Sequence, residues 1–230
     1  MRTGTIVLVT LLCQGLWGAE KLAYTGEVFD KDNKKVFNYE RFQDKQGDKI
    51  LGRAVYKSLD GQEVFVEKIE SINNKLVRLD IYQKQLKQEA SILIKDGTVH
   101  FNLKKPGEKM STSTESFKDN FIVGLEIVPY VQKHWDKLVK GEDLSIRFGV
   151  WSRQESVGFD LSKDKVENGN MIVKMSASSM FIRALVSPMY FVFDSQTKEL
   201  SSYSGRLVPQ IKKGGEFVEF DGSVRYQKIQ

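Results

Sequence analysis

Alternation of apolar and polar residues in runs of seven or eight positions is the feature that most constrains this fold. It is clearest in VFNYERF (36–42), KLVRLDIY (75–82), TVHFNLK (98–104) and LSIRFGV (144–150). A period of two places every second side chain on the same face, which is typical of strands with one buried face. Turn-forming pairs such as Asp-Gly separate the runs by short distances, and short connections join antiparallel neighbours.

About a dozen strands can be counted, which is too many for a flat open sheet. We therefore predict a mainly β fold in which one large, curved antiparallel sheet forms a half-barrel or open barrel. Residues 20–230 are expected to form a single domain. If the domain divides, we expect the division near 105–120, because the polar segment KKPGEKMSTSTESFKDN (104–120) follows the first seven strands.

The first nineteen residues have the outline of a secretory signal peptide. Arg2 precedes an apolar run from Ile6 to Trp17, and small residues follow as far as Ala19. We expect cleavage after Ala19 and a periplasmic protein of a Gram-negative envelope, with a retained N-terminal anchor as the alternative. Cys13 is the single cysteine, and the leucine before it does not suit lipidation, so the processed chain should carry no acyl group and no thiol.

Two segments replace the alternation with a helical pattern. In PYVQKHWDKLVKG (129–141) an apolar stripe is formed by Val131, Trp135 and Leu138, with a proline at the start and a glycine at the end. We predict that this helix packs on the concave side of the sheet. The second helix is predicted in SSMFIRALVSP (178–188), where a serine suits the N-cap and the proline ends the helix.

The stretch SASSMFIRALVSPMYFVF (176–193) is the least polar part of the chain after the N-terminus. A membrane helix needs about 20 apolar residues, and Arg183, Ser187 and Pro188 divide this stretch, so we do not expect an integral membrane protein. The predicted helix has hardly any polar face, and we expect it to line or close the mouth of the trough. Its candidate ligand-binding residues are Met180, Phe181, Arg183 and Leu185.

The role of Arg183 stays open at this point. Its guanidinium either reaches solvent along its own alkyl stem or holds the acidic head of an amphipathic ligand. An internal ion pair with a carboxylate of the sheet is the alternative.

A second candidate surface lies at the end of LSIRFGV (144–150). If the apolar residues of this run face the core, the alternation places the positions between them on the opposite face. The members of this candidate surface are Arg147, Trp151 and Arg153. Arginine and tryptophan together can hold anionic or glycosidic groups, and ordinary cross-strand pairing of the arginines with acidic residues is the alternative.

Residues suited to catalysis are scarce. His100 alternates with apolar neighbours and should face solvent, and His134 and Asp136 are two apart on a helix, so they point to different faces. Ser162 and Lys165 match the spacing of penicillin-recognising enzymes, but the companion motifs are absent from the sequence. We therefore expect a non-enzymatic protein without a metal or other cofactor.

Charge sets a further limit on the partners. The chain carries a formal net charge of +5, but acidic and basic residues alternate along its length. A nucleic-acid partner would require a basic stripe, so we expect none. Mild attraction to anionic lipids or glycans is compatible with this charge.

The motifs in KHWDKLVKGEDLSIRFGVWSRQESVGFDLS (133–162) carry a resemblance to a known family. A His-Trp helix, a Gly-Glu turn, a strand ending in Ser152 and Arg153, and then VGFDL resemble a group of exported β-rich proteins of unknown function in Gram-negative bacteria. RALVSP and FDSQTKELSSYSG continue the likeness, and YTGEV and LDGQEV do so more loosely. Where the family usually shows Val-Pro-Ser-Arg, this chain has Trp151 in place of the proline.

The architecture of that family resembles the half-barrel of lipoprotein carriers of the LolA and LolB type, in which a curved sheet wraps around helices and shelters acyl chains. Two functional classes follow. The first is a periplasmic binding or carrier module for an apolar or amphipathic, lipid-like ligand. The second is a structural or interaction protein of the envelope, with a protein or glycan partner and a trough filled by its own helices. A connected apolar cavity beside the packed helices would favour the first class.

Overall fold

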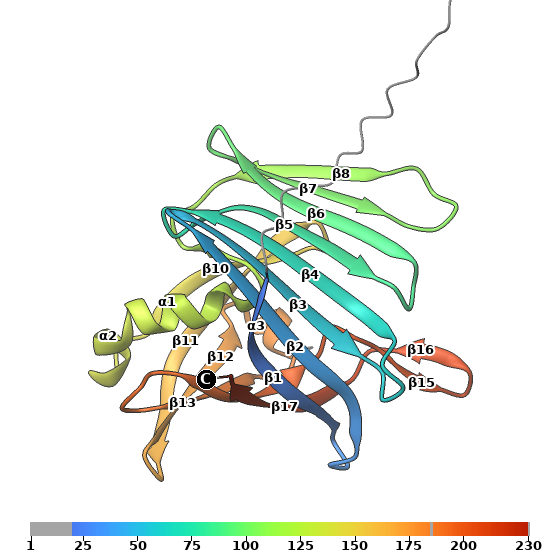
Figure 1. Cartoon of the computed structure of the whole chain (residues 1–230). Helices are drawn as coiled ribbons and strands as arrows, with labels where there is room; N and C mark the ends of the chain where they lie inside the picture. Colours follow the sequence, from blue (N-terminus) through green and yellow to red (C-terminus); the bar gives the residue numbers. More distant parts are fainter. Residues whose placement is uncertain (1–19, 185, 230) are drawn as a thin grey trace, which may run out of the picture.

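The computed structural model describes residues 20–184 and 186–229, except for the side chain of Leu125. The predicted signal peptide (1–19) and the candidate site residue Leu185 lie outside the described residues. Strands of one large, curved antiparallel sheet make up most of the described chain, and three short α-helices accompany them (Figure 1). The prediction of a mainly β fold with an open, curved sheet is confirmed.

The first half of the sheet is a succession of hairpins in chain order. Its strands are β1 (Lys21–Asp30), β2 (Lys35–Gln46), β3 (Lys49–Lys57), β4 (Glu63–Ile72), β5 (Lys75–Gln83), β6 (Gln88–Lys95), β7 (Thr98–Lys104) and β8 (Ser111–Ser116). Seven strands precede residue 104, as predicted, but the segment 104–120 is more than a linker, because β8 forms within it and pairs with β7.

The tight turns use the residues that the sequence offers for them. Asn73 and Asn74 join β4 to β5 with φ of 51° and 58°, and Asp96 and Gly97 join β6 to β7 with φ of 49° and 72°. Two-residue hairpins of this kind need positive φ at both positions, which asparagine, aspartate and glycine adopt at low cost.

The second half of the sheet is joined to the first by the last strand of the chain. Its strands are β9 (Phe121–Ile122), β10 (Leu144–Val150), β11 (Glu155–Glu167), β12 (Asn170–Ala177), β13 (Met189–Asp194), β14 (Leu200–Arg206) and β17 (Asp221–Lys228). The strand order is β8-β7-β6-β5-β4-β3-β2-β1-β17-β14-β13-β12-β11-β10-β9, and only the β9–β10 pair of this sheet is parallel.

A separate hairpin is formed by β15 (Ile211–Lys213) and β16 (Glu216–Val218), which projects beside the sheet (Figure 1). The described chain thus has seventeen strands where the sequence suggests about a dozen. The excess comes partly from β9, β15 and β16, since strands of two or three residues are too short to show alternation.

Both hydrophobic cores lie on one face of the sheet. Val28, Val224, Tyr203 and Phe191 are directly opposed from strand to strand across the middle of the sheet, and opposed residues share a face. The first core covers β1 to β7 on this concave face, and the second covers β10 to β14.

Two helices cover the second core. They are α1 (Ile127–Lys133) and α2 (Trp135–Val139), and a 3₁₀ turn, η1 (Gly124–Glu126), leads into α1. The sequence predicted one continuous helix at 129–141, and this is wrong: two helices occupy the segment. The backbone leaves the helical conformation at His134, where φ is −104° and ψ is 18°. The stripe of Val131, Trp135 and Leu138 is buried as predicted, and the Trp135 ring meets the edge of Phe193 at 6.0 Å between centroids. The third helix is α3 (Met180–Arg183).

The β9–β10 edge of the sheet rolls inward and covers the first core. The Phe121 ring lies 6.4 Å from that of Phe101 on β7, and the Trp151 ring lies 6.4 Å from that of Phe65 on β4. A Cβ on Gly149 would stand 2.7 Å from the Phe121 ring, so only glycine allows this close approach. The trough is therefore filled by the edge of its own sheet and by α1 and α2.

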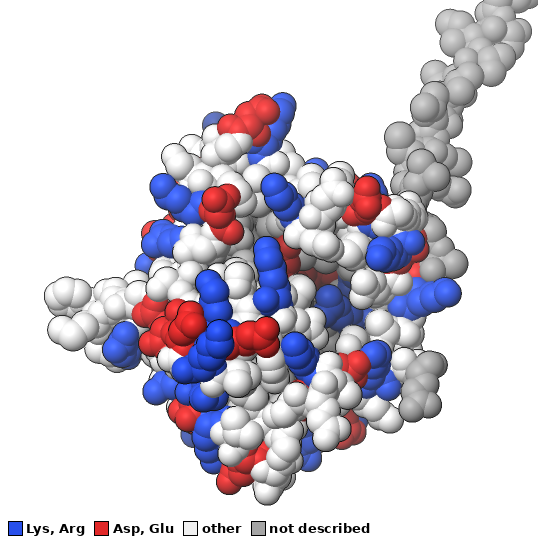
Figure 2. All heavy atoms as spheres, turned by 90° about the vertical axis from the view of Figure 1, so that its left-hand side faces the viewer, with Lys and Arg blue, Asp and Glu red and all other residues white. Residues whose placement is uncertain are grey.

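The helices of the described residues are short, and α1, with seven residues, is the longest α-helix. None of the described helices is long and apolar enough to span a bilayer. On the face shown in Figure 2, lysine and arginine side chains lie beside aspartate and glutamate side chains, as the alternation of charges in the sequence implies.

Candidate functional site

The short helix α3 leaves two large apolar side chains in solvent. Met180 is 81% and Phe181 88% exposed, the highest values among the exposed large hydrophobic residues described. Ile182 points the other way and packs against the second core. The predicted helix 178–188 is too long, since α3 ends at Arg183 and the chain must reach the start of β13 six residues later. The described chain leaves the side of this helix that carries Met180 and Phe181 uncovered.

Arg183 has no ion-pair partner among the described residues. Its side chain is exposed, and its Nε donates a hydrogen bond to the carbonyl oxygen of Ala177 at 3.0 Å. The alternative of an internal pair with a carboxylate of the sheet is therefore wrong. Within the described ranges, no acidic side chain forms an ion pair with this guanidinium.

The three residues predicted to form one surface around β10 are not brought together. β10 ends one residue before Trp151, so the alternation stops there, and the Trp151 ring packs into the first core against Phe65. Arg153 lies in the turn and pairs with Glu155 at 2.7 Å. Arg147 stays on β10. The shared Arg147–Trp151–Arg153 surface is thus wrong, because it extends a strand period into a turn.

Arg147 instead lies close to the approach to α3. Its Nε donates to the Ser156 hydroxyl at 3.0 Å and its Nη2 to the Ser156 carbonyl at 2.5 Å. A Cβ on Gly158 would be 3.7 Å from Nη1 of Arg147 and 3.5 Å from the hydroxyl of Ser178, which directly precedes α3. Of the three residues proposed around β10, Arg147 is thus the one that lies near the segment leading into α3.

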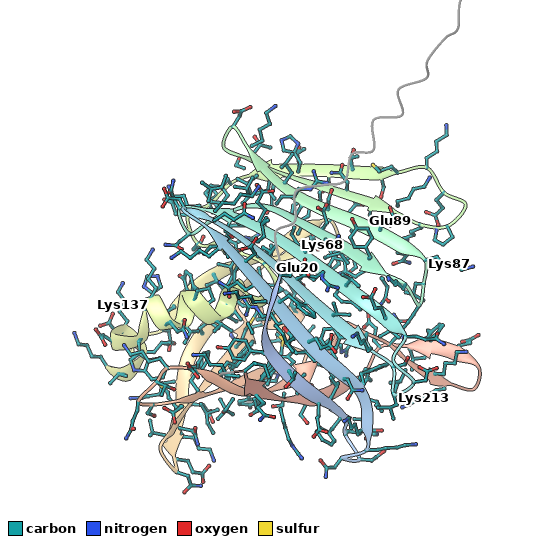
Figure 3. All side chains as sticks on the ribbon, viewed as in Figure 1. Glu20, Lys68, Lys87, Glu89, Lys137 and Lys213 are labelled. Carbon is teal, nitrogen blue, oxygen red and sulfur yellow. The ribbon has the colours of Figure 1, made fainter. Side chains whose placement is uncertain are left out.

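A groove that the sequence did not predict lies between the sheet and the β15–β16 hairpin. It has a volume of about 670 Å³. Figure 3 labels Lys87, in the β5–β6 turn, and Lys213, at the end of β15, on the two elements that flank it. The apolar residues that line the groove are Val36, Phe37, Val64, Ile211 and Phe217.

Two glutamine side chains hold the hairpin segment against the end of β5. Nε2 of Gln85 donates to the carbonyl of Gln210 at 2.7 Å, and the backbone N–H of Gln210 donates to Oε1 of Gln85 at 2.8 Å. Nε2 of the buried Gln83 donates to the carbonyl of Val208 at 3.1 Å. These amides replace the backbone pairing that a strand would supply. A glutamine at an inward position of β5, after Leu79 and Ile81, is the sequence signal that was missed.

The charged residues of the groove are unequally paired. Glu63 forms ion pairs with Lys84 and, at 3.5 Å, with Arg53, and the hydrogen bond from Lys84 is the main reason that the pKa of Glu63 is lowered. Nζ of Lys212 lies 5.2 Å from the ring centroid of Phe217 and has no carboxylate partner among the described residues. Asp60, a second acid of the lining, accepts hydrogen bonds from Ser58 and from Nε2 of Gln62. The groove therefore combines apolar walls, the Glu63–Lys84 pair, the carboxylate of Asp60 and the cation of Lys212.

A polar centre lies inside the trough, where η1 crosses β4. The carboxyl of Glu126 accepts the N–H of Val123 at 3.4 Å and hydrogen-bonds with Ser71. The Glu67 carboxylate lies against Gly124, where any side chain would collide with it. Burial raises the pKa of Glu126 to about 7, and the negative charge of Glu67 adds to this effect.

A cluster of tyrosines borders the polar centre. The ring centroid of Tyr39 is 5.0 Å from that of Tyr56 and 5.3 Å from that of Tyr226. Burial raises the pKa of all three phenols. The void beside Tyr39, Arg41 and Tyr226 has a volume of about 30 Å³, which suits a single water molecule and not an acyl chain.

The catalytic motifs considered from the sequence gain no support from their surroundings. His100 faces away from its two inward-facing neighbours on β7, as predicted, but it is half-buried where an exposed side chain was expected. His134 packs against Tyr130 with ring centroids 4.6 Å apart. Lys165, the partner of Ser162 in the suggested motif, is paired with Glu167 at 2.7 Å. In the part of the chain that the structure describes, no group of three or more His, Cys, Asp or Glu residues could hold a metal ion.

Comparison of the chain with protein-family models and with curated protein sequences gives no match. The fold and the two surfaces, the groove and α3, therefore carry the functional argument. They belong to a protein with one open, curved β-sheet, whose concave face is covered by α1, α2 and the β9–β10 edge.

Proposed function

We propose that the protein is an exported, periplasmic and non-enzymatic binding module that holds an amphipathic, lipid-like ligand in the groove under the β15–β16 hairpin. The observation that carries this proposal is the groove itself. Its volume of about 670 Å³ lies within the range of small-molecule sites, roughly 300 to 1,000 Å³. The likeness to the exported β-rich family and to lipoprotein carriers is part of the same proposal.

The ligand site proposed here differs from the trough expected from the sequence. The void beside Tyr39 and Tyr226, of about 30 Å³, is too small for a lipid tail. In the groove, an apolar tail would lie along Phe37, Val64 and Ile211, which removes apolar surface from water on both sides. An anionic head would lie at Lys212, whose charge has no described carboxylate partner.

Titration with an acidic fluorescent lipid tests this proposal. In Ile211→Glu, the added carboxylate stands in the groove wall and would repel the anionic ligand, so we expect affinity to fall at least about tenfold. Val208→Glu is the matched control, because Val208 belongs to the same segment, is exposed and does not line the groove. Equal affinity of wild type and Ile211→Glu would refute the groove as the site.

An envelope protein with an interaction role and no small ligand is the second candidate. It is favoured by the filling of the trough by α1, α2 and the rolled β9–β10 edge, with Trp151 and Phe121 packed into the first core. A native mass spectrum of the protein from periplasmic extract separates the two candidates. A co-purifying lipid supports the binding module, whereas bare protein that also fails to bind the fluorescent lipid supports the interaction role.

A further inference from the structure

The exposed face of α3 is a surface of a different kind from the groove. We call Met180, Phe181 and Arg183 the α3 knuckle. Both apolar side chains are more than four-fifths exposed, and the cation beside them has no acidic partner among the described residues. We propose that the α3 knuckle docks the protein on an anionic lipid surface, with the two apolar side chains entering the headgroup region and Arg183 next to lipid phosphates.

The knuckle is held in its outward orientation by the sheet below it. Ile182 is partly buried against the second core, which fixes the opposite side of the helix turn toward solvent. The N–H of Ser178 donates to the carbonyl of Gly158 at 3.0 Å, and the N–H of Arg183 donates to the carbonyl of Ser179 at 2.9 Å. A preorganised turn loses little further conformational freedom on binding, so exposed apolar side chains on it are effective anchors.

The size of the knuckle favours a lipid surface over a protein partner. A stable protein interface buries about 800 Å² on each partner, and two projecting side chains bury only a small part of that. Lipid headgroups need no matching shape, and aromatic side chains partition well into this region.

Charge points to anionic lipid in particular. Arg183 has no acidic partner among the described residues, and Arg147 lies close to Ser178 at the start of the turn. The formal net charge of +5 becomes +4 when Arg2 is removed with the signal peptide, so the processed chain stays positive. One acidic residue, Asp160, lies on the same strand face as Gly158. Its carboxylate accepts a hydrogen bond from the hydroxyl of Ser145 at 2.8 Å. Each basic residue near an anionic surface strengthens binding by about fivefold, so the expected attachment is weak and reversible.

Co-sedimentation with lipid vesicles tests the inference. The processed protein purified from cells is used, with the same N-terminus in every variant. We expect binding to phosphatidylcholine vesicles that contain phosphatidylglycerol, weaker binding to pure phosphatidylcholine, and a decrease with added salt. Phe181→Ser should reduce the partition coefficient roughly tenfold to a hundredfold. Arg183→Gln should reduce it about fivefold on the anionic vesicles and leave it unchanged on the neutral ones.

Met110→Ser is the matched control, because Met110 is also exposed, at 58%, and follows Lys109 in the sequence. The inference is wrong if Met110→Ser reduces vesicle binding as much as Phe181→Ser does. It is also wrong if the wild-type protein does not co-sediment with anionic vesicles. A second readout is Phe181→Trp, whose added fluorescence should be quenched by brominated lipid while Trp135, in the core, is not. The groove variant Ile211→Glu should bind vesicles as well as wild type does. The vesicle test therefore does not depend on whether the groove binds a ligand.

Discussion

Glu126 should make the stability of the protein fall as the pH rises through the range from about 4.5 to 7. Its pKa is raised from 4.5 to about 7 in the folded state, mainly by burial and further by the charge of Glu67. Between these two values the folded chain keeps a proton that the unfolded chain has lost. The folded state binds more protons there, so the free energy of unfolding decreases with rising pH and becomes constant above the folded pKa.

The size of the effect follows from the shift in pKa. Each pKa unit corresponds to about 1.4 kcal/mol, so the full change is on the order of 3 kcal/mol. Glu126→Gln removes the ionisable group but keeps the size of the side chain and its capacity for hydrogen bonds. We therefore expect this variant to match wild type near pH 4.5 and to exceed it by about 3 kcal/mol at pH 8.

Ionisation of His134 has the opposite effect on the free energy of unfolding over part of the same pH range. Burial lowers its pKa below 6.5, and Lys133 and Lys137 lower it further, so the unfolded state binds more protons and stability is lost as the pH falls. The difference between wild type and Glu126→Gln cancels this contribution if the two sites act independently.

Urea unfolding from pH 4.5 to 8, followed by the fluorescence of Trp135 and Trp151, measures the effect. Glu89→Gln is the control, because Glu89 is exposed on β6 (Figure 3), and its curve should follow wild type at every pH. A difference between Glu126→Gln and wild type that does not change with pH would refute the reasoning. It would mean that the pKa of Glu126 is the same in the folded and the unfolded protein.

Three further predictions concern the core, export and the hairpin. Trp135→Ala should lower the free energy of unfolding by about 3 to 5 kcal/mol in urea, because Trp135 is buried between α2 and β13; an unchanged curve would place this helix outside the core. N-terminal sequencing of protein from periplasmic extract should start near Glu20, and a lipid-modified Cys13 would contradict the expected cleavage. Gln85→Ala should weaken the attachment of the hairpin and speed amide exchange at Gln210, whereas unchanged exchange would show that the paired amide bonds are not what holds it.

The local part of the fold could be predicted from the sequence because its causes are local. Alternation places Val99, Phe101 and Leu103 on one face of β7, and all three are buried. Asn73 and Asn74 allow the positive φ of a tight turn, so the hairpin between β4 and β5 follows from two residues. Such features depend on side chains within a few positions of one another.

The break between α1 and α2 is a feature that the local sequence pattern does not predict. The segment 129–141 has a continuous apolar stripe, and the buried residues predicted from it are correct. The helix nevertheless breaks at His134, where the ring packs on Tyr130, four residues earlier. The stripe determines which side faces the core, whereas the course of the backbone depends on the surface of β11 to β13 beneath it, which the sequence pattern does not describe.

The candidate site depends on contacts between distant segments, and for that reason the sequence pattern did not show it. Gln85 and Gln210 are 125 positions apart, yet their hydrogen bonds fix one wall of the groove. In the trough, the β9–β10 edge rolls onto the first core, and Gly149 lets Phe121 approach closely. Both surfaces for which we propose binding lie at the margin of the sheet or on its connections. The groove lies beside the hairpin and the knuckle lies between β12 and β13, so both proposed surfaces occur where this architecture leaves room for them.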